Sequence, residues 1–127
     1  MRIEHLALWV KDLEKTKDFY IKYFSGKANN KYNNSRTGFE SYFITFADGA
    51  RLELMCNLAE DREACDSLRL GFIHIAFSAG SSEKVDELTE LLRQDGYKVV
   101  SGPRRTGDGY YESCVLDPEG NQVEITV

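Results

Sequence analysis

The fold can be worked out from residues 2–10, which read RIEHLALWV, and from residues 71–78, which read GFIHIAFS. In both stretches apolar residues recur at every second position, a period that predicts a β-strand. Each stretch is followed by a residue that can cap a helix and then by a helical pattern. Together they predict that the chain is built from two copies of one unit.

The first copy is expected to run strand, helix and then three strands. Its helix carries an apolar side, and a polar loop rich in asparagine follows it. The expected elements are a helix from Asp12 to about Phe24 with Gly26 just past its end, strands at 39–46 and 51–56, and a hairpin turn at Asp48-Gly49.

The second copy repeats this order. Ser81 or Ser82 can cap its helix, which is expected to stop at Gly96. The apolar stripe of this helix is predicted to be Val85, Leu88, Leu91 and Leu92. The other expected elements are strands at 71–78, 97–100, 110–116 and 121–127, a glycine-rich loop through Gly102, Gly107 and Gly109, and a type I turn at Asp117-Pro118-Glu119-Gly120.

Length and composition suit one domain, residues 1–127, made of a module at 1–57, a charged linker at 58–70 and a module at 71–127. The net charge of −5, without a block of Lys or Arg, argues against nucleic acid as a partner. The longest early apolar run, residues 6–10, is too short for a signal peptide or a membrane span, so we expect a cytoplasmic protein without a membrane partner.

The cysteines form neither a Cys-x-x-Cys pair nor an even-numbered framework. There are three of them, Cys56, Cys65 and Cys114. No neighbouring base in the sequence would activate any of them as a nucleophile, so we expect buried or idle thiols.

Strand parity groups the two histidines of the chain with two glutamates. His5 and His74 lie 69 positions apart and Glu53 and Glu124 lie 71 apart, each on the strand face opposite an aliphatic row. A single His or Glu on a strand usually faces water. Two neutral imidazoles and two carboxylates carry a charge of −2, which one divalent cation cancels. The set therefore predicts a metal site, and its donors suit zinc, nickel, cobalt, iron or manganese.

The whole chain resembles the vicinal oxygen chelate superfamily, also called the glyoxalase/bleomycin-resistance/dioxygenase group. The resemblance is carried by residues 2–5, Asp12, Phe19-Tyr20, residues 117–121 and residues 123–125. It implies an α+β fold in which two βαβββ modules form an open, cup-shaped sheet around a metal. It also implies a homodimer, often with each site shared between the chains.

The order His, Glu, His, Glu resembles bacterial glyoxalase I in particular. Extradiol dioxygenases and fosfomycin-resistance enzymes of the superfamily typically use His, His, Glu, methylmalonyl-CoA epimerases tend to have Gln at the place of Glu53, and bleomycin-type binding proteins lack the metal ligands. The resemblance implies a lyase that converts the hemithioacetal of methylglyoxal through a metal-bound enediolate. Glu124 is then the expected base and Glu53 its partner, because a carboxylate must move a proton between adjacent carbons.

The resemblance has one departure that bears on the thiol cosubstrate. Glyoxalase I usually has an Arg near the end of the first strand that holds a carboxylate of glutathione, whereas this chain has Trp9. The candidates for holding such an anion are Arg36, Arg51, Arg104 and Arg105, the last two being favoured by the glycine-rich loop. Trp9, Tyr42 and Met55 are candidates for an apolar lining.

Two classes of function remain open from the sequence. One is a metal-dependent enzyme acting on a small molecule, either glyoxalase I with glutathione or another thiol, or a relative such as an epimerase or dioxygenase. The other is a module that binds a drug or metabolite without needing the metal.

Overall fold

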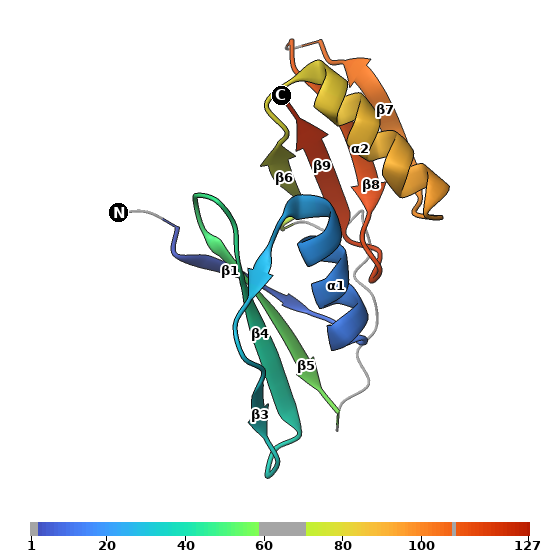
Figure 1. The fold of residues 1–127 in the computed structure, drawn as a ribbon. Coiled ribbons are helices and arrows are strands. Elements are labelled where there is room, and N and C mark those ends of the chain that lie inside the picture. The colour runs from blue at the N-terminus through green and yellow to red at the C-terminus, as the bar shows by residue number, and fades with distance from the viewer. Residues whose placement is uncertain (1–2, 59–70, 108) are drawn as a thin grey trace. The chain divides into compact units, whose positions relative to one another are not determined.

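The computed structural model describes residues 3–58, 71–107 and 109–127. Contacts along the chain divide it into two units, Met1–Ala64 and Cys65–Val127, which we call unit 1 and unit 2. Each unit has one helix and one sheet (Figure 1). The predicted linker at 58–70 lies, apart from Leu58, outside the described residues.

Unit 1 has a mixed sheet in which the first and last strands are parallel neighbours. The order across the sheet is β1-β5-β4-β2, with β3 also paired to β4. The elements are β1 (His5–Trp9), α1 (Leu13–Phe24), β2 (Lys27–Ala28), β3 (Tyr32–Asn34), β4 (Phe39–Thr45) and β5 (Arg51–Asn57).

The short strands β2 and β3 occupy the region predicted as a polar loop. Because β5 pairs with one edge of β4, β2 and β3 share the other edge and act as a single interrupted strand. Asn29 spans the interruption, since its backbone N–H donates to the carbonyl of Phe43 and its side chain accepts from the N–H of Phe43. The predicted order of strand, helix and three strands is therefore confirmed for unit 1.

Helix α1 begins as predicted, because the Asp12 side chain accepts from the N–H of Lys15. It also ends at Phe24 with Gly26 just past its end, as predicted. The left-handed residue is Ser25, with φ of 55°, and not Gly26. A Cβ on Gly26 would lie 2.5 Å from Cγ2 of Ile44, so this glycine is needed for close packing against β4.

The core of unit 1 lies between α1 and the sheet, since α1 packs on β4 and β5. The aliphatic row expected on β5, Leu52 and Leu54, is buried there. From α1, the buried side chains are Leu13, Thr16, Phe19, Tyr20 and Tyr23. Burial of this face of the sheet leaves the opposite face for polar side chains.

Unit 2 repeats the arrangement with four strands in the order β6-β9-β8-β7. The parallel pair is again formed by the first and last strands. The elements are β6 (His74–Ser78), α2 (Ser82–Gln94), β7 (Val99–Arg105), β8 (Tyr111–Leu116) and β9 (Gln122–Thr126). The α+β class and the two-module βαβββ order predicted from the sequence are thus confirmed.

The buried side of α2 differs from the predicted leucine stripe. Ser81 caps the helix, and Val85, Thr89 and Leu92 are its buried residues. Leu91 is 44% exposed, because a residue six positions after Val85 points about 120° away from it on a helix. The hydroxyl of Thr89 is satisfied in the core by the carbonyl of Val85 and by Ser113.

Strand β7 is longer than predicted and includes residues assigned from the sequence to the glycine-rich loop. Its pairing with β8 contains two register shifts, which interrupt the alternation that would have revealed the strand. The predicted turn at Asp117–Gly120 is present, with the N–H of Gly120 donating to the carbonyl of Asp117. No helix in the described part of the chain has the length and hydropathy needed to cross a membrane.

Candidate metal centre

In unit 1, the parallel pairing of β1 with β5 brings His5 and Glu53 together. Ala7 is the strand partner of Glu53, and His5 precedes Ala7 by two positions. All three side chains therefore lie on the face opposite α1. The Nε2 atom of His5 is 3.9 Å from Oε2 of Glu53.

Unit 2 places its own pair in the same register. Ala76 is the strand partner of Glu124, and His74 precedes Ala76 by two positions. The Nε2 atom of His74 lies 3.3 Å from Oε2 of Glu124. In both units a small alanine beside the glutamate leaves room for the longer histidine side chain to approach it.

The two pairs have similar exposure as well as similar register. The histidine side chains are 42% and 37% exposed, whereas those of Glu53 and Glu124 are 16% and 22% exposed. Each carboxylate is thus largely withdrawn from water, and a carboxylate in such a place requires a cationic or hydrogen-bonding partner.

The donors of each pair fit a divalent metal. Both histidines turn Nε2 toward a carboxylate oxygen. Two ligands held at about 2.0–2.2 Å from one ion lie about 3–3.5 Å apart, so the pair in unit 2 has the spacing of two ligands and the pair in unit 1 is slightly wider. In the described part of either unit, no group of three His, Cys, Asp or Glu side chains suits a metal. Each unit by itself therefore provides two of the four predicted ligands.

A second carboxylate contacts His5, and the sequence did not single it out. Oε2 of Glu4 lies 2.5 Å from Nδ1 of His5, and Glu4 also pairs with Arg51. The hydrogen bond with His5 lowers the pKa of the Glu4 carboxyl most, and the neighbouring Arg51 lowers it further. Glu4 thus remains an anion at neutral pH.

The two arginines predicted to hold an anion lie on β7 and not on a loop. Arg104 is the partner of Glu112, which places it on the face that carries Glu124. Arg105 is the partner of Tyr111 on the other face, where its guanidinium donates to the carbonyl of Gly109 and lies 6.0 Å from the centroid of the Tyr111 ring. Only Arg104 of the two shares a face with a candidate ligand.

Apolar and aromatic side chains lie beside Glu53 on unit 1. Trp9 and Met55 are strand partners two positions beyond Ala7 and Glu53, and therefore lie on the same face. The rings of Trp9 and Phe39 meet edge-on, with their centroids 6.1 Å apart. The centroid of the Tyr32 ring lies 6.0 Å from that of Phe39. Strand alternation along residues 39–46 could have placed Phe39 on this face, because Phe39 lies four positions before Phe43, the strand partner of Glu53.

Tyr42, in contrast, lies on the helix side of the same sheet. Its hydroxyl donates to Glu14 at 3.0 Å, and the ammonium of Lys17 lies over its ring. Tyr42 is therefore not part of the apolar surface beside Glu53.

The described cysteines have the environment of unreactive thiols. Cys56 and Cys114 are both buried. Burial raises the pKa of the Cys114 thiol, and the carboxylates of Glu124 and Glu112 raise it further. Cys114 thus stays protonated at neutral pH. Cys65 lies outside the described residues.

Comparison with known proteins defines the class to which this fold and these residues belong. The chain matches the Glyoxalase/Bleomycin resistance protein/Dioxygenase superfamily over residues 2–125, and it is a member of that superfamily. A solved glyoxylase/bleomycin resistance protein/dioxygenase domain from Frankia sp. EAN1pec has the same fold, with a TM-score of 0.84 at 18% identity, covering 100% of this chain and 97% of that one.

Three relatives align over nearly the whole chain. The uncharacterized protein YqjT of Bacillus subtilis is 30% identical, covering 97% of this chain and 96% of the relative. The lactoylglutathione lyase of Escherichia coli O157:H7 is 29% identical, covering 98% of this chain and 91% of that protein. The metallothiol transferase FosB of Lysinibacillus sphaericus is also 29% identical, covering 97% of this chain and 79% of that protein.

Proposed function

We propose that the protein is a metal-dependent lyase of the glyoxalase I type, which isomerises the hemithioacetal formed by methylglyoxal and a thiol. One observation carries the proposal. The same His–Glu pair occurs at the same register in both units, with Nε2 to Oε2 separations of 3.9 and 3.3 Å. Similarity to a lactoylglutathione lyase over 98% of the chain supports this choice within the superfamily.

The ligands of the proposed metal are His5, Glu53, His74 and Glu124. Two imidazoles and two carboxylates would balance the charge of one divalent ion such as zinc, nickel, cobalt, iron or manganese. The pairs that meet at one ion come either from one chain or from the two chains of a homodimer. When bound, the ion supplies Lewis-acid polarisation of the adjacent substrate oxygens.

The proton transfer itself is assigned to a carboxylate of this chain. Oε2 of Glu124 would take the proton from one substrate carbon and return it to the neighbouring carbon, so that the reaction is an isomerisation without an external acid or base. Glu124 is favoured over Glu53 because its strand, β9, directly follows the tight turn at Gly120. Glu53 is the more buried of the two, which suits a fixed ligand.

The surface beside Glu53 bears on which thiol is used. Trp9 and Phe39 offer an apolar contact and no positive charge. A carboxylate of the thiol would instead be met by Arg104, which lies on the face of Glu124 in unit 2. We therefore expect a thiol with an apolar part to compete well with glutathione.

A second candidate function is a module that binds a drug or metabolite. The exposed rings of Trp9 and Tyr32 favour it, since they are 42% and 53% exposed and could stack on a planar ligand. On this alternative the metal is incidental to the function.

An activity assay separates the two candidates. Purified protein is loaded in turn with each of the five candidate metals and mixed with methylglyoxal and glutathione or another thiol, and thioester formation is followed. Turnover that disappears with a chelator and returns with metal supports the lyase. Binding of aromatic compounds by metal-free protein, with no turnover under any metal and thiol, would instead support the binding module.

A further inference from the structure

His5 is held from both sides by carboxylates of unit 1. Its Nδ1 atom lies 2.5 Å from Glu4, and its Nε2 atom faces Glu53. Glu4 stands just before β1 begins, so its side chain is not bound by strand alternation and reaches the ring of the next residue. His5 is therefore contacted by an acceptor at the nitrogen that faces away from the candidate ligand Glu53.

Glu4 is itself fixed in place by Arg51. The N–H of Arg51 donates to the carbonyl of Glu4 at 3.0 Å, and the two side chains form an ion pair. The guanidinium also lies 4.2 Å from the centroid of the Phe43 ring, and His5 meets the same ring edge-on at 5.5 Å. These four side chains form one cluster, Glu4, His5, Phe43 and Arg51, on the face of Glu53.

The cluster determines which ring nitrogen of His5 carries the proton. An ionised carboxylate only accepts hydrogen bonds, so Nδ1 must donate to Glu4 and Nε2 of the neutral ring keeps its lone pair. That lone pair faces Glu53, where a metal would be ligated. Because Arg51 neutralises Glu4, the contact adds no net charge to the surroundings of the metal.

Unit 2 has no equivalent of Glu4 at the same position. The residue before His74 is Ile73, whose side chain is apolar and cannot accept a hydrogen bond. The two His–Glu pairs thus share a register, but only His5 has a carboxylate from the preceding residue at its Nδ1 atom. His74 therefore serves as a comparison for His5 within the same chain.

We propose that Glu4 is a positioning residue that fixes His5 in the Nδ1–H tautomer and thereby strengthens metal binding through Nε2. The effect on metal binding rests on the proposed function, whereas the tautomer does not. Carboxylates that hold a ligating histidine in this way typically change metal affinity by about 10–100-fold when removed.

The first measurement is made on metal-free protein. Long-range ¹H–¹⁵N NMR of the ring nitrogens distinguishes the two tautomers, and the chain has only two histidines to assign. At a pH where the imidazole is neutral, wild type should show His5 protonated at Nδ1 and unprotonated at Nε2, and Glu4→Ala should populate the Nε2–H form. Glu4→Gln retains an acceptor oxygen and should keep much of the wild-type tautomer, which also covers the case in which Glu4→Ala folds poorly.

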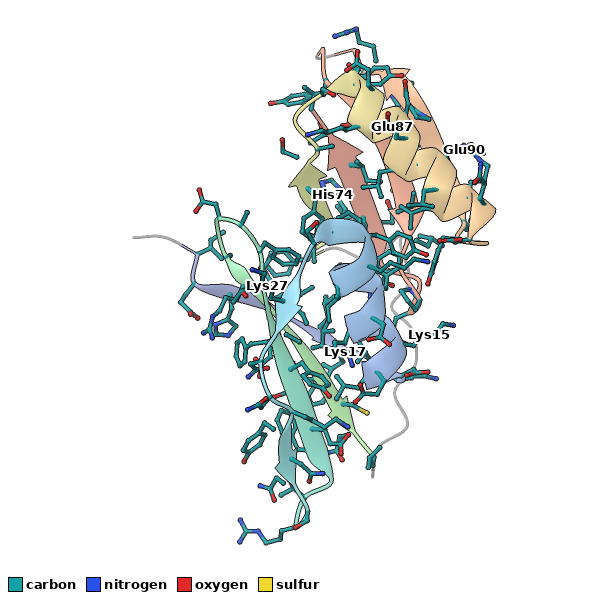
Figure 2. All side chains as sticks on the ribbon, viewed as in Figure 1. Lys15, Lys17, Lys27, His74, Glu87 and Glu90 are labelled. Atoms are coloured by element: carbon teal, nitrogen blue, oxygen red, sulfur yellow. The ribbon has the colours of Figure 1, made fainter. Side chains whose placement is uncertain are left out.

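The second measurement is Zn²⁺ affinity, determined by competition with a chromophoric chelator. Glu4→Ala should bind Zn²⁺ about 10–100-fold more weakly than wild type. Glu87→Ala is the control, because it removes the same charge from the exposed side of α2 (Figure 2) and should bind as wild type does.

Three results would overturn the proposal: an Nε2–H tautomer in wild type, an unchanged tautomer in Glu4→Ala, or equal Zn²⁺ affinities in Glu4→Ala and Glu87→Ala. If wild type binds no Zn²⁺ at all, the proposed function fails and so does the stated effect of Glu4 on affinity. The NMR result then still decides whether Glu4 fixes the tautomer.

Discussion

Glu53 and Glu124 have equivalent strand positions, each with a histidine of its own unit beside it, but they belong to different parts of the chain. Glu53 lies on β5, and Glu124 lies on β9 near the C-terminus. A carboxylate that both ligates a metal and moves a proton must be able to leave the metal. In the proposed mechanism this carboxylate is Glu124, whose side chain is 22% exposed against 16% for Glu53.

Replacement of each glutamate by glutamine tests that assignment. Glu124→Gln keeps the shape and an oxygen ligand but removes the basic group, so turnover should fall by about 10²–10⁴-fold while the fold remains. Glu53→Gln should lose less, because the base is still present. Steady-state kinetics with matched metal loading would check both. The reverse ranking would move the base to Glu53, and negligible losses in both would favour the binding module.

The face on which a candidate ligand lies can be predicted from the sequence where the residue belongs to a regular strand, because strand alternation determines the direction of its side chain. His5, Glu53, His74 and Glu124 all lie within regular strands, so their parity placed each on its correct face. Glu4 escaped prediction because it precedes β1, where alternation no longer determines the direction of a side chain.

At the scale of elements, regular apolar patterns predicted the helices and long strands, and short or irregular elements were missed. Strands β2 and β3 have two and three residues and mostly polar side chains, which resemble a loop. Strand β7 contains register shifts that interrupt its pattern. Tertiary pairing with β4 and β8 creates these strands, and a local sequence pattern does not contain that information.

The end of α1 gives a stability test at this scale. Ser25→Gly should stabilise unit 1 by about 0.5–1 kcal/mol, because glycine adopts the left-handed conformation without the steric strain of a side chain. The gain is limited because glycine loses more backbone entropy on folding than serine does. Gly26→Ala should destabilise it by about 1–3 kcal/mol, because its Cβ would collide with Ile44. Urea unfolding of the two variants should therefore shift the midpoint in opposite directions. A midpoint for Gly26→Ala at or above that of wild type would contradict the close packing of Gly26 against Ile44.

At the scale of the whole molecule, we predict a homodimer. Among the described residues, the strands at the ends of each sheet order, such as β1 and β6, pair with one neighbour within their sheet, and an exposed edge or face is commonly covered by a second chain. Light scattering at micromolar concentration should give twice the 14.5 kDa mass of the chain. A monomeric mass together with full activity would remove this prediction.

Metal content tests the central claim most directly. Wild-type protein, reconstituted with Zn²⁺ or Ni²⁺ and dialysed against non-chelating buffer, should hold about one ion per chain by elemental analysis. It should also lose thermal stability on chelation, because a ligand that binds only the folded state stabilises that state. His5→Ala and His74→Ala should each lose most of this metal, since each removes one of four ligands from the same ion. Stoichiometric metal in His74→Ala, or none in wild type, would contradict the claim that the two His–Glu pairs form one divalent site.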